Sequence, residues 1–180
     1  MYDASPKMVR ALMDLIYRTL QRPEDIIEWG PANLVNKRES DESIQRVIRN
    51  DQAKTGKMVD IRVSADIERI LASLVPEGIL IGPGMPFIHT RTGEPYTYSG
   101  ISSMFRRTVY AAYKRGAISA PFGFYDLKGK GATDMWRAGV PLTLIQVLCG
   151  NESVRTTEIY VKARWRETVE PNQTPLLAVQ

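Results

Sequence analysis

The spacing of apolar residues constrains the fold of this 180-residue chain more than any other feature of its sequence. Near the N-terminus these residues recur every three or four positions, at Val9, Leu12, Met13, Ile16 and Leu20, which is typical of a helix with one buried face. Clear strand-like alternation occurs in one region, at Val59, Ile61 and Val63. The pattern therefore predicts a mainly α domain with a small antiparallel β-sheet, in the α+β class.

Capping and helix-breaking residues indicate where the helices begin and end. Hydroxyl caps and first-turn prolines predict helix starts at Ser5-Pro6, at Pro23 (ending near Trp29) and at Ser64. Further helices are expected over 99–116, over 126–138 with Asp126 as the cap and Gly139 as the stop, over 141–150, and from the cap Ser153 past Tyr160.

The predicted sheet is a hairpin. Residues 44–50 are expected to pair with the alternating strand at 59–63 through a turn over 52–57, where Gly56 can adopt the unusual backbone angles. The polar stretch Asn36 to Ser43 is interpreted as a surface loop, and so is the Gly- and Pro-rich stretch over 76–86. Phe87 to His89 is a candidate short strand.

The composition excludes several kinds of site. One cysteine, Cys149, can form neither an internal disulfide nor a cysteine-based zinc site, and the single histidine, His89, argues against a histidine metal site. We therefore expect no metal and no cofactor. Cys149 lies on an apolar stripe and is expected to be buried, and His89 is expected to be a hydrogen-bonded structural residue.

Neither a membrane span nor a secretion signal is visible. The longest apolar runs fall well short of the roughly 20 residues that a spanning helix needs, and the first residues lack a signal-peptide layout. We therefore expect a cytoplasmic protein with no membrane partner.

Basic residues are concentrated in one segment of the chain. The net charge of the whole chain is +4, whereas residues 101–130 carry six basic residues against Asp126 alone, a net charge of +5. These are Arg106, Arg107, Lys114, Arg115, Lys128 and Lys130. A concentrated basic surface favours a nucleic-acid partner, although an ordinary solvated helix face is the alternative.

The segment from Gly139 to Lys162 carries the most specific motif. It reads Gly-Val-Pro-Leu, then Ile145-Gln146, Cys149-Gly150-Asn151, and finally Thr156-Thr157-Glu-Ile-Tyr160. This run resembles the C-terminal signature of the tyrosine recombinase (phage integrase) family, in which "L-G-H" and "S-x-x-T-T-x-x-Y" end on a nucleophilic tyrosine. The resemblance implies that Tyr160 is the nucleophile.

Three further boxes follow the order of the same family, so the resemblance covers nearly the whole chain. Thr19 to Ile26 resembles the first arginine box, Gln52 to Lys57 resembles the hairpin lysine box, and Phe124 to Lys128 stands where the family has "H-x-L-R". The resemblance implies a tyrosine recombinase catalytic domain over 1–170. It makes Arg22 a phosphate clamp and Lys54 the general acid, with Lys57 as the less favoured alternative.

The implied chemistry suits these residue types. A tyrosine hydroxyl attacks a DNA phosphorus and forms a 3′-phosphotyrosine, which a 5′-hydroxyl later reverses. The reference pKa of tyrosine is near 10, so only about one phenol in a thousand is ionised at pH 7 and the site must help to remove its proton. Arginine forks stabilise the charge that develops on phosphate, and a mobile lysine can protonate the leaving oxygen.

The chain departs from the family pattern at several site positions. Tyr125 replaces the second-box histidine, Lys128 replaces the second arginine, Asn151 replaces the histidine after Leu-Gly, and Leu20 replaces the glycine of "T-G-x-R". Lys128 keeps the charge but loses bidentate geometry. Loss of one charge-assisted bond, worth about 1.5–3 kcal/mol, would slow cleavage by roughly 10- to 150-fold. Gly129 and Gly131 also predict a weakened helix.

The resemblance also implies partners. We expect double-stranded DNA, contacted by Arg106, Arg107, Lys130 and Arg155, and self-association as a tetramer on DNA. The tail over 171–180 would be exchanged between subunits or disordered. Relatives usually carry a separate N-terminal DNA-binding domain, so the chain is expected to be a fragment or a truncated product of a bacterial or phage gene.

Three alternative functions stay open. The substitutions would suit a decayed recombinase that binds DNA without cutting it. A type IB topoisomerase shares the tyrosine and the basic cluster. A helical binding module without chemistry would leave the four ordered boxes unexplained.

Overall fold

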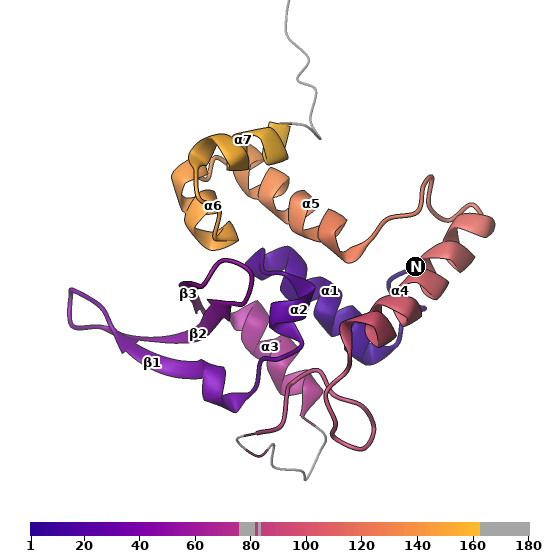
Figure 1. Cartoon of the computed structure of the whole chain (residues 1–180), viewed down its shortest axis with the longest axis horizontal. Helices are drawn as coiled ribbons and strands as arrows, with labels where there is room; N and C mark the ends of the chain where they lie inside the picture. The colour runs from indigo at the N-terminus through magenta and orange to yellow at the C-terminus, as the bar shows by residue number, and fades with distance from the viewer. Residues whose placement is uncertain (76–81, 83, 163–180) are drawn as a thin grey trace, which may run out of the picture.

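The computed structural model describes residues 1–75, 82 and 84–162, without the side chains of Tyr160 and Lys162. Helices make up about half of it, with one small sheet (Figure 1). In chain order the elements are α1 (Lys7–Thr19), α2 (Pro23–Ile26), the short 3₁₀ helix η1 (Pro31–Asn33), β1 (Leu34–Arg38), β2 (Ile44–Gln52), β3 (Lys57–Arg62), α3 (Ala65–Leu74), α4 (Tyr98–Lys114), α5 (Phe124–Arg137), α6 (Leu142–Cys149) and α7 (Val154–Lys162). The predicted mainly α class with a small antiparallel sheet is confirmed.

The sheet has three antiparallel strands in the order β1-β2-β3. The expected hairpin pairs β2 with β3, with Asn50 opposite Val59. The interpretation of Asn36 to Ser43 as a loop is wrong for its first residues, because residues 36–38 belong to β1 and Asn36 lies opposite Arg46. This edge strand escapes periodicity because its mostly polar side chains face solvent while its backbone still pairs with β2.

Helix α1 lies at the centre of the main core. Leu12, Leu15 and Ile16 are fully buried in a cluster that also takes side chains from the sheet, α3 and α4. A second cluster holds α5, α6 and α7 together through Ala132, Ile145, Cys149 and Val161, with Leu20 from the end of α1 inserted among them. Figure 1 shows these three helices as a unit beside the β2–β3 hairpin.

Several predicted helix ends are confirmed. Ser64 accepts a hydrogen bond from the backbone of Ile67, Ser153 accepts one from Thr156, and Gly150 closes α6 in the left-handed conformation. Two predicted helix starts were wrong by a few residues. Pro6 rather than Ser5 is the N-cap of α1, and α5 begins at Phe124, before Asp126.

Asp126 caps the N-terminus of α5 from inside the helix, not from the residue before it as predicted. Its carboxylate accepts the backbone N–H of Gly123 at 2.7 Å from the third position of α5. A carboxylate there satisfies a free donor and interacts well with the helix dipole.

Leu20 adopts a backbone conformation that usually favours glycine. It ends α1 with φ 55° and ψ 23°, in the left-handed region, and its side chain is fully buried. This is the position at which the family motif has glycine. A non-glycine residue in that conformation costs about 1–2 kcal/mol, which the burial of an apolar side chain, about 1.5–3 kcal/mol, can offset.

His89 makes a hydrogen bond, as predicted: its Nδ1 lies 2.8 Å from the carbonyl oxygen of Thr90, and the residue is buried. The expected strand at Phe87 to His89 is reduced to one bridge between His89 and Pro95. No helix among the described residues is long and apolar enough to cross a membrane.

Candidate active site

The predicted site residues from different boxes meet around the C-terminal end of α6. The last carbonyl groups of any helix lack intrahelical donors and carry the negative end of its dipole. Here the Cys149 carbonyl accepts the Lys128 ammonium at 3.3 Å, and the Asn151 carbonyl accepts Lys57 at 3.1 Å. Helix α5 and strand β3 are thereby tied to the α6–α7 loop.

Lys128 is buried in the site, and the expected basic surface of residues 101–130 therefore does not include it. Lys128 lies on α5, and the residue is 7% exposed. Burial lowers the pKa of Lys128, as does the nearby Arg22, whereas Cys149 and Asp25 raise it. Two cationic side chains, Lys128 and Arg22, therefore face one region of low dielectric, which favours an anion between them.

Arg22 lies immediately before α2 and is held from two sides. Its guanidinium Nη1 donates to the Gln52 side-chain oxygen at 3.3 Å and lies 3.8 Å from an oxygen of Asp25. The other oxygen of Asp25 accepts the backbone N–H of Ala53, next to Lys54, at 3.4 Å. Burial raises the pKa of Asp25, although the Ala53 bond and Arg22 act against it.

Sequence reasoning missed Asp25 as a site residue. Its carboxylate touches both the arginine box and the lysine hairpin. The available signal was its spacing of three residues after Arg22, at which an acidic and a basic residue at a helix start can pair.

Tyr125 is engaged by an acidic residue. Its hydroxyl donates to the two carboxylate oxygens of Glu24 at 2.9 and 2.8 Å. Partial burial and these bonds raise the pKa of Tyr125, so this phenol stays protonated at neutral pH. A hydroxyl donating to Glu24 must rotate before it can donate to a phosphate.

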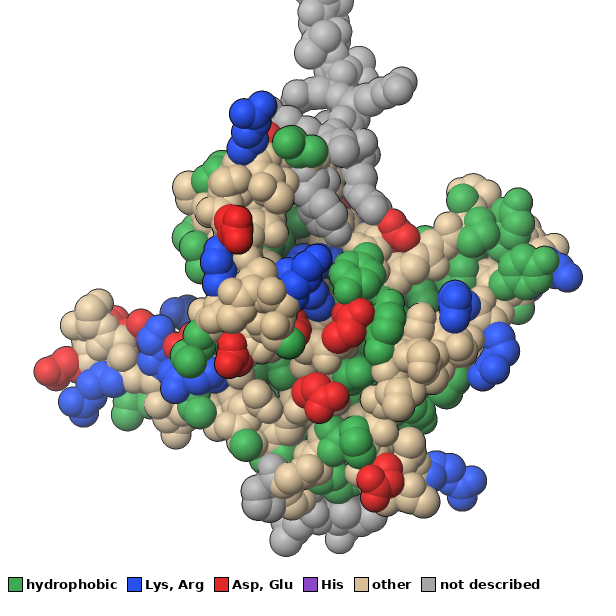
Figure 2. All heavy atoms as spheres, in the orientation of Figure 1, with side chains coloured by type: hydrophobic (Ala, Val, Ile, Leu, Met, Phe, Trp, Pro, Cys, Tyr) green, Lys and Arg blue, Asp and Glu red, His purple; other side chains and the backbone are tan. Residues whose placement is uncertain are grey.

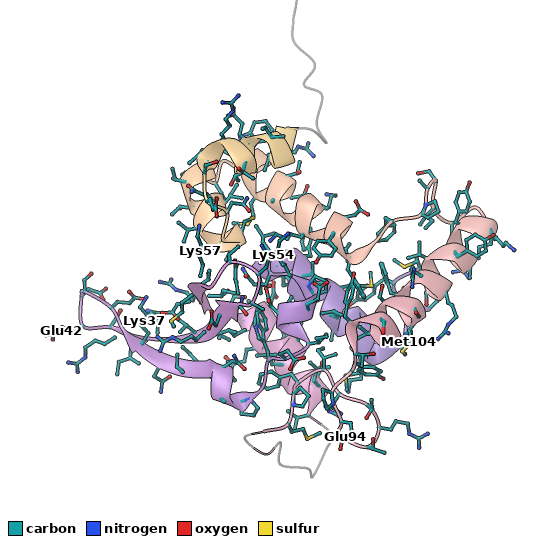
Figure 3. All side chains as sticks on the ribbon, viewed as in Figure 1. Lys37, Glu42, Lys54, Lys57, Glu94 and Met104 are labelled. Atoms are coloured by element: carbon teal, nitrogen blue, oxygen red, sulfur yellow. The ribbon has the colours of Figure 1, made fainter. Side chains whose placement is uncertain are left out.

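Lys54 and Lys57 lie at the end of the β2–β3 hairpin beside α6 (Figure 3). Lys57 is committed to the Asn151 carbonyl. Lys54 is exposed in the turn, and its ammonium makes no hydrogen bond or ion pair with the residues that the structure describes. Of the two, Lys54 is the one that remains available to a substrate.

Helix α7 places the backbone of Tyr160 next to this site, whereas the tyrosine side chain lies outside the described part of the chain. The helix is anchored through Thr157, which accepts the Asn151 amide at 2.9 Å, and through Val161, which is fully buried in the second cluster. The anchors therefore lie on both sides of Tyr160 in the sequence.

A cavity of about 140 Å³ opens between these elements. Its lining residues are Tyr125, Lys128, Asn151 and Thr156. Three of these four are positions where the chain departs from the family motif, so the substitutions line one space. The cavity can take a small anion such as a phosphate group, with Lys128 as its cation.

The remaining candidate DNA contacts lie on exposed surface. Arg106 and Arg107 are exposed on α4, Arg155 is exposed on α7, and Lys130 on α5 pairs with Asp134. Figure 2 shows other Lys and Arg side chains where the hairpin meets the α5–α7 helices. Cys149 is buried, as predicted, and burial raises the pKa of its thiol.

The sequence matches the phage integrase family over residues 1–166, and the chain belongs to that family. No curated protein matches it. Among solved structures, the lambda integrase tetramer bound to a Holliday junction has a TM-score of 0.71 and 22% identity, covering 96% of this chain and 47% of that one.

Two further structures have the same fold. The lambda integrase catalytic core has a TM-score of 0.62 and 22% identity over 82% of each chain, and XerA recombinase has 0.62 and 18% over 89% of this chain and 54% of that one. The chain spans about half the length of the larger integrases that it matches. These likenesses confirm the tyrosine recombinase catalytic fold.

Proposed function

We propose that this chain is the catalytic domain of a site-specific DNA recombinase that cleaves and rejoins strands through a 3′-phosphotyrosine at Tyr160. The observation that carries the proposal is the meeting of the boxes: Arg22, Lys57, Lys128 and Asn151 come from four separate segments and converge on the end of α6. Packing alone does not require three basic side chains and an amide from separate segments to gather at one helix end.

The proposed reaction is a balanced exchange of two ester bonds. The phenol oxygen of Tyr160 forms a bond to phosphorus while the bond from phosphorus to the 5′-oxygen breaks. The phenol proton passes to water, and the Lys54 ammonium donates a proton to the leaving 5′-oxygen and regains one from water, so no proton is consumed overall. Arg22 and Lys128 stabilise the negative charge on the non-bridging oxygens.

Double-stranded DNA and further copies of the chain are the proposed partners. The lambda integrase structures include a dimer on a core site and a tetramer on a Holliday junction. The proposed exchanged segment, 171–180, lies outside the described residues. Its deletion should weaken DNA-dependent assembly in a sedimentation experiment, and unchanged assembly would refute the exchange.

A trapping assay tests the function. Binding sequences are first selected from a random pool of DNA. The protein is then incubated with duplexes of these sequences that carry a nick beside the cleavage site, so that the short cleaved fragment diffuses away and the covalent adduct is trapped. The parent should form a covalent protein–DNA band, Tyr160→Phe should form none, and Tyr113→Phe, at an exposed tyrosine of α4, should behave as the parent.

A decayed recombinase is the second candidate, and two observations favour it. Tyr125 is bonded to Glu24, and Lys128 is bonded to the Cys149 carbonyl and lacks the bidentate geometry of an arginine, so the site holds a phosphate less firmly than two arginines would. DNA binding by the parent without a covalent band would support this candidate. Relaxation of supercoiled DNA lacking any selected site would instead support a topoisomerase.

A further inference from the structure

A chain of buried side-chain amides runs from the core to the candidate site. The indole N–H of Trp29 donates to the Asn50 oxygen at 2.8 Å, and the Asn50 amide donates to the Gln21 oxygen at 2.9 Å. The Gln52 amide donates to the same Gln21 oxygen at 2.8 Å. All four side chains are buried, so each unmade bond would be costly.

Gln52 is the member of this chain that contacts Arg22 directly and shares a carbonyl partner with Lys128. Its oxygen accepts Arg22 at 3.3 Å and the Thr55 hydroxyl at 2.8 Å. Its nitrogen donates to the Cys149 carbonyl at 3.3 Å, and this carbonyl also accepts Lys128 at 3.3 Å. One side chain therefore contacts the Arg22 guanidinium and the anchor of the Lys128 ammonium.

The orientation of the Gln52 amide is fixed by its surroundings. The oxygen faces donors, Arg22 and Thr55, and the nitrogen faces the oxygens of Gln21 and Cys149, so a flipped amide would oppose like groups on both sides. Gly150 provides the space, because a Cβ there would lie 2.1 Å from the Gln52 oxygen. The hydrogen bonds therefore hold the Gln52 amide in one orientation, and Gly150 leaves room for it.

We propose that Gln52 is a positioning residue, which fixes the Arg22 guanidinium for the scissile phosphate and couples it to the end of α6 that anchors Lys128. The inference rests on the proposed function. The Asp25 carboxylate, at 3.8 Å from Arg22, is too distant for a hydrogen bond. The Gln52 oxygen supplies the directional contact that holds a long, flexible side chain in one geometry.

The first test examines the contact without DNA. Phenylglyoxal modifies accessible, mobile guanidinium groups, and its rate at Arg22 can be followed by mass spectrometry of peptic peptides. Gln52→Met removes the acceptor and should raise the rate at Arg22 several-fold. Gln52→Glu keeps an acceptor for Arg22 while losing the bonds to Gln21 and Cys149, so it should leave the rate at or below that of the parent. Equal rates for both variants would overturn the proposal.

The second test examines the consequence for cleavage. Gln52→Met should slow formation of the covalent band by about 10- to 100-fold, because a small misplacement of a catalytic group has effects of this size, while DNA affinity stays unchanged. A methylphosphonate at the cleaved position replaces one charged oxygen by a methyl group and leaves less charge for Arg22 to stabilise. The gap between parent and variant should therefore narrow on that substrate.

Trp29→Phe is the matched control, because it breaks the same amide chain at its far end and makes no contact with Arg22. The rate of covalent-band formation by Trp29→Phe, divided by that of the parent, should be the same on the phosphate and the methylphosphonate substrates. If Gln52→Met behaves like Trp29→Phe, Gln52 has only a structural role and the inference fails. Gln52→Ala, whose cavity admits water, replaces Gln52→Met if the latter does not fold.

The two hypotheses fail in different ways. If the parent forms no covalent band on DNA that it binds, the proposed cleavage is wrong, and the modification rates alone decide whether Gln52 holds Arg22. If the parent cleaves and the Gln52 variants match it, cleavage stands and the positioning role is wrong.

Discussion

At the scale of single residues, the two hairpin lysines have distinct expected effects. Lys54 is exposed and Lys57 is bonded to the Asn151 carbonyl. Lys54→Ala should slow covalent-band formation by roughly 100- to 10,000-fold, the usual range for a lost general acid. A 5′-sulfur leaving group departs without a proton and should restore most of that rate, as measured in single-turnover assays.

Lys57→Ala serves as the comparison for Lys54→Ala. Its defect comes from a displaced α6–α7 loop, and the sulfur substrate should not relieve it. If the sulfur substrate restored the rate of Lys57→Ala and not that of Lys54→Ala, Lys57 would be the general acid in place of Lys54.

Asp25 should make stability depend on pH with a defined sign. Burial raises its pKa above the ordinary value of 3.8, so the folded state binds more protons than the unfolded state between 3.8 and the raised value. The free energy of unfolding of the parent, relative to Asp25→Asn, should therefore fall as pH rises through that window. Urea unfolding of both proteins at a series of pH values measures this difference.

Asp41 provides a control of opposite sign. Hydrogen bonds from the hydroxyl and backbone N–H of Ser43 lower its pKa, so its contribution is lost as pH falls toward and below 3.8. Asp41→Asn should therefore give a difference that increases with pH. A pH-independent difference for Asp25→Asn would contradict the inferred burial penalty.

At the scale of elements, Gly131 in α5 is a packing requirement. A Cβ at Gly131 would lie 2.3 Å from the Tyr17 carbonyl oxygen and 2.7 Å from a methyl group of Leu20. Gly131→Ala should lower the free energy of unfolding by about 1–3 kcal/mol, the usual cost of overpacking. This opposes the gain of roughly 1 kcal/mol that alanine brings to a helix. Thermal and urea unfolding measure the net effect.

Ala111→Gly, at an exposed position of α4, is the reference for normal helix propensity. It should be destabilising by about 1 kcal/mol. If Gly131→Ala is stabilising, the close approach of α1 and α5 is not as tight as the structure has it.

The elements differ in how much of them the sequence predicts. The α-helices and the β2–β3 hairpin are marked by periodicity, caps and Gly56, all of which act within a few residues. Strand β1 has no such mark, because its pairing partner specifies it. Gly131 of α5 and the left-handed Leu20 are explained by the contact between α1 and α5, in which Gly131 leaves room for the Leu20 side chain.

The site divides in the same way. The motif identifies Arg22, Lys128 and Asn151 because their spacing follows the family. Asp25 and Gln52 are defined by contacts between segments that lie about 30 to 100 residues apart, as in the bonds joining Asp25 to Ala53 and Gln52 to Cys149. Such long-range partners leave no periodic signal in one sequence.

At the scale of the whole molecule, the distribution of charge predicts how DNA binding responds to salt. Each phosphate contact lowers the slope of log affinity against log salt by about 0.9, through release of condensed counterions. Arg106, Arg107 and Arg155 are exposed on α4 and α7. Replacing each of them by Gln should therefore make the slope less negative by about 1, as measured by fluorescence anisotropy.

Arg69→Gln on α3 is the control for these substitutions. Arg69 is exposed but paired with Asp66, on a helix that contributes no residue to the candidate site. The slope of this variant should equal that of the parent. Lys130, which pairs with Asp134, should change the slope by less than Arg106, because a paired ammonium displaces fewer counterions from DNA. If Arg106, Arg107 and Arg155 all leave the slope unchanged, α4 and α7 lie outside the DNA interface. The contacts would then have to come from the basic side chains at the hairpin, such as Lys54.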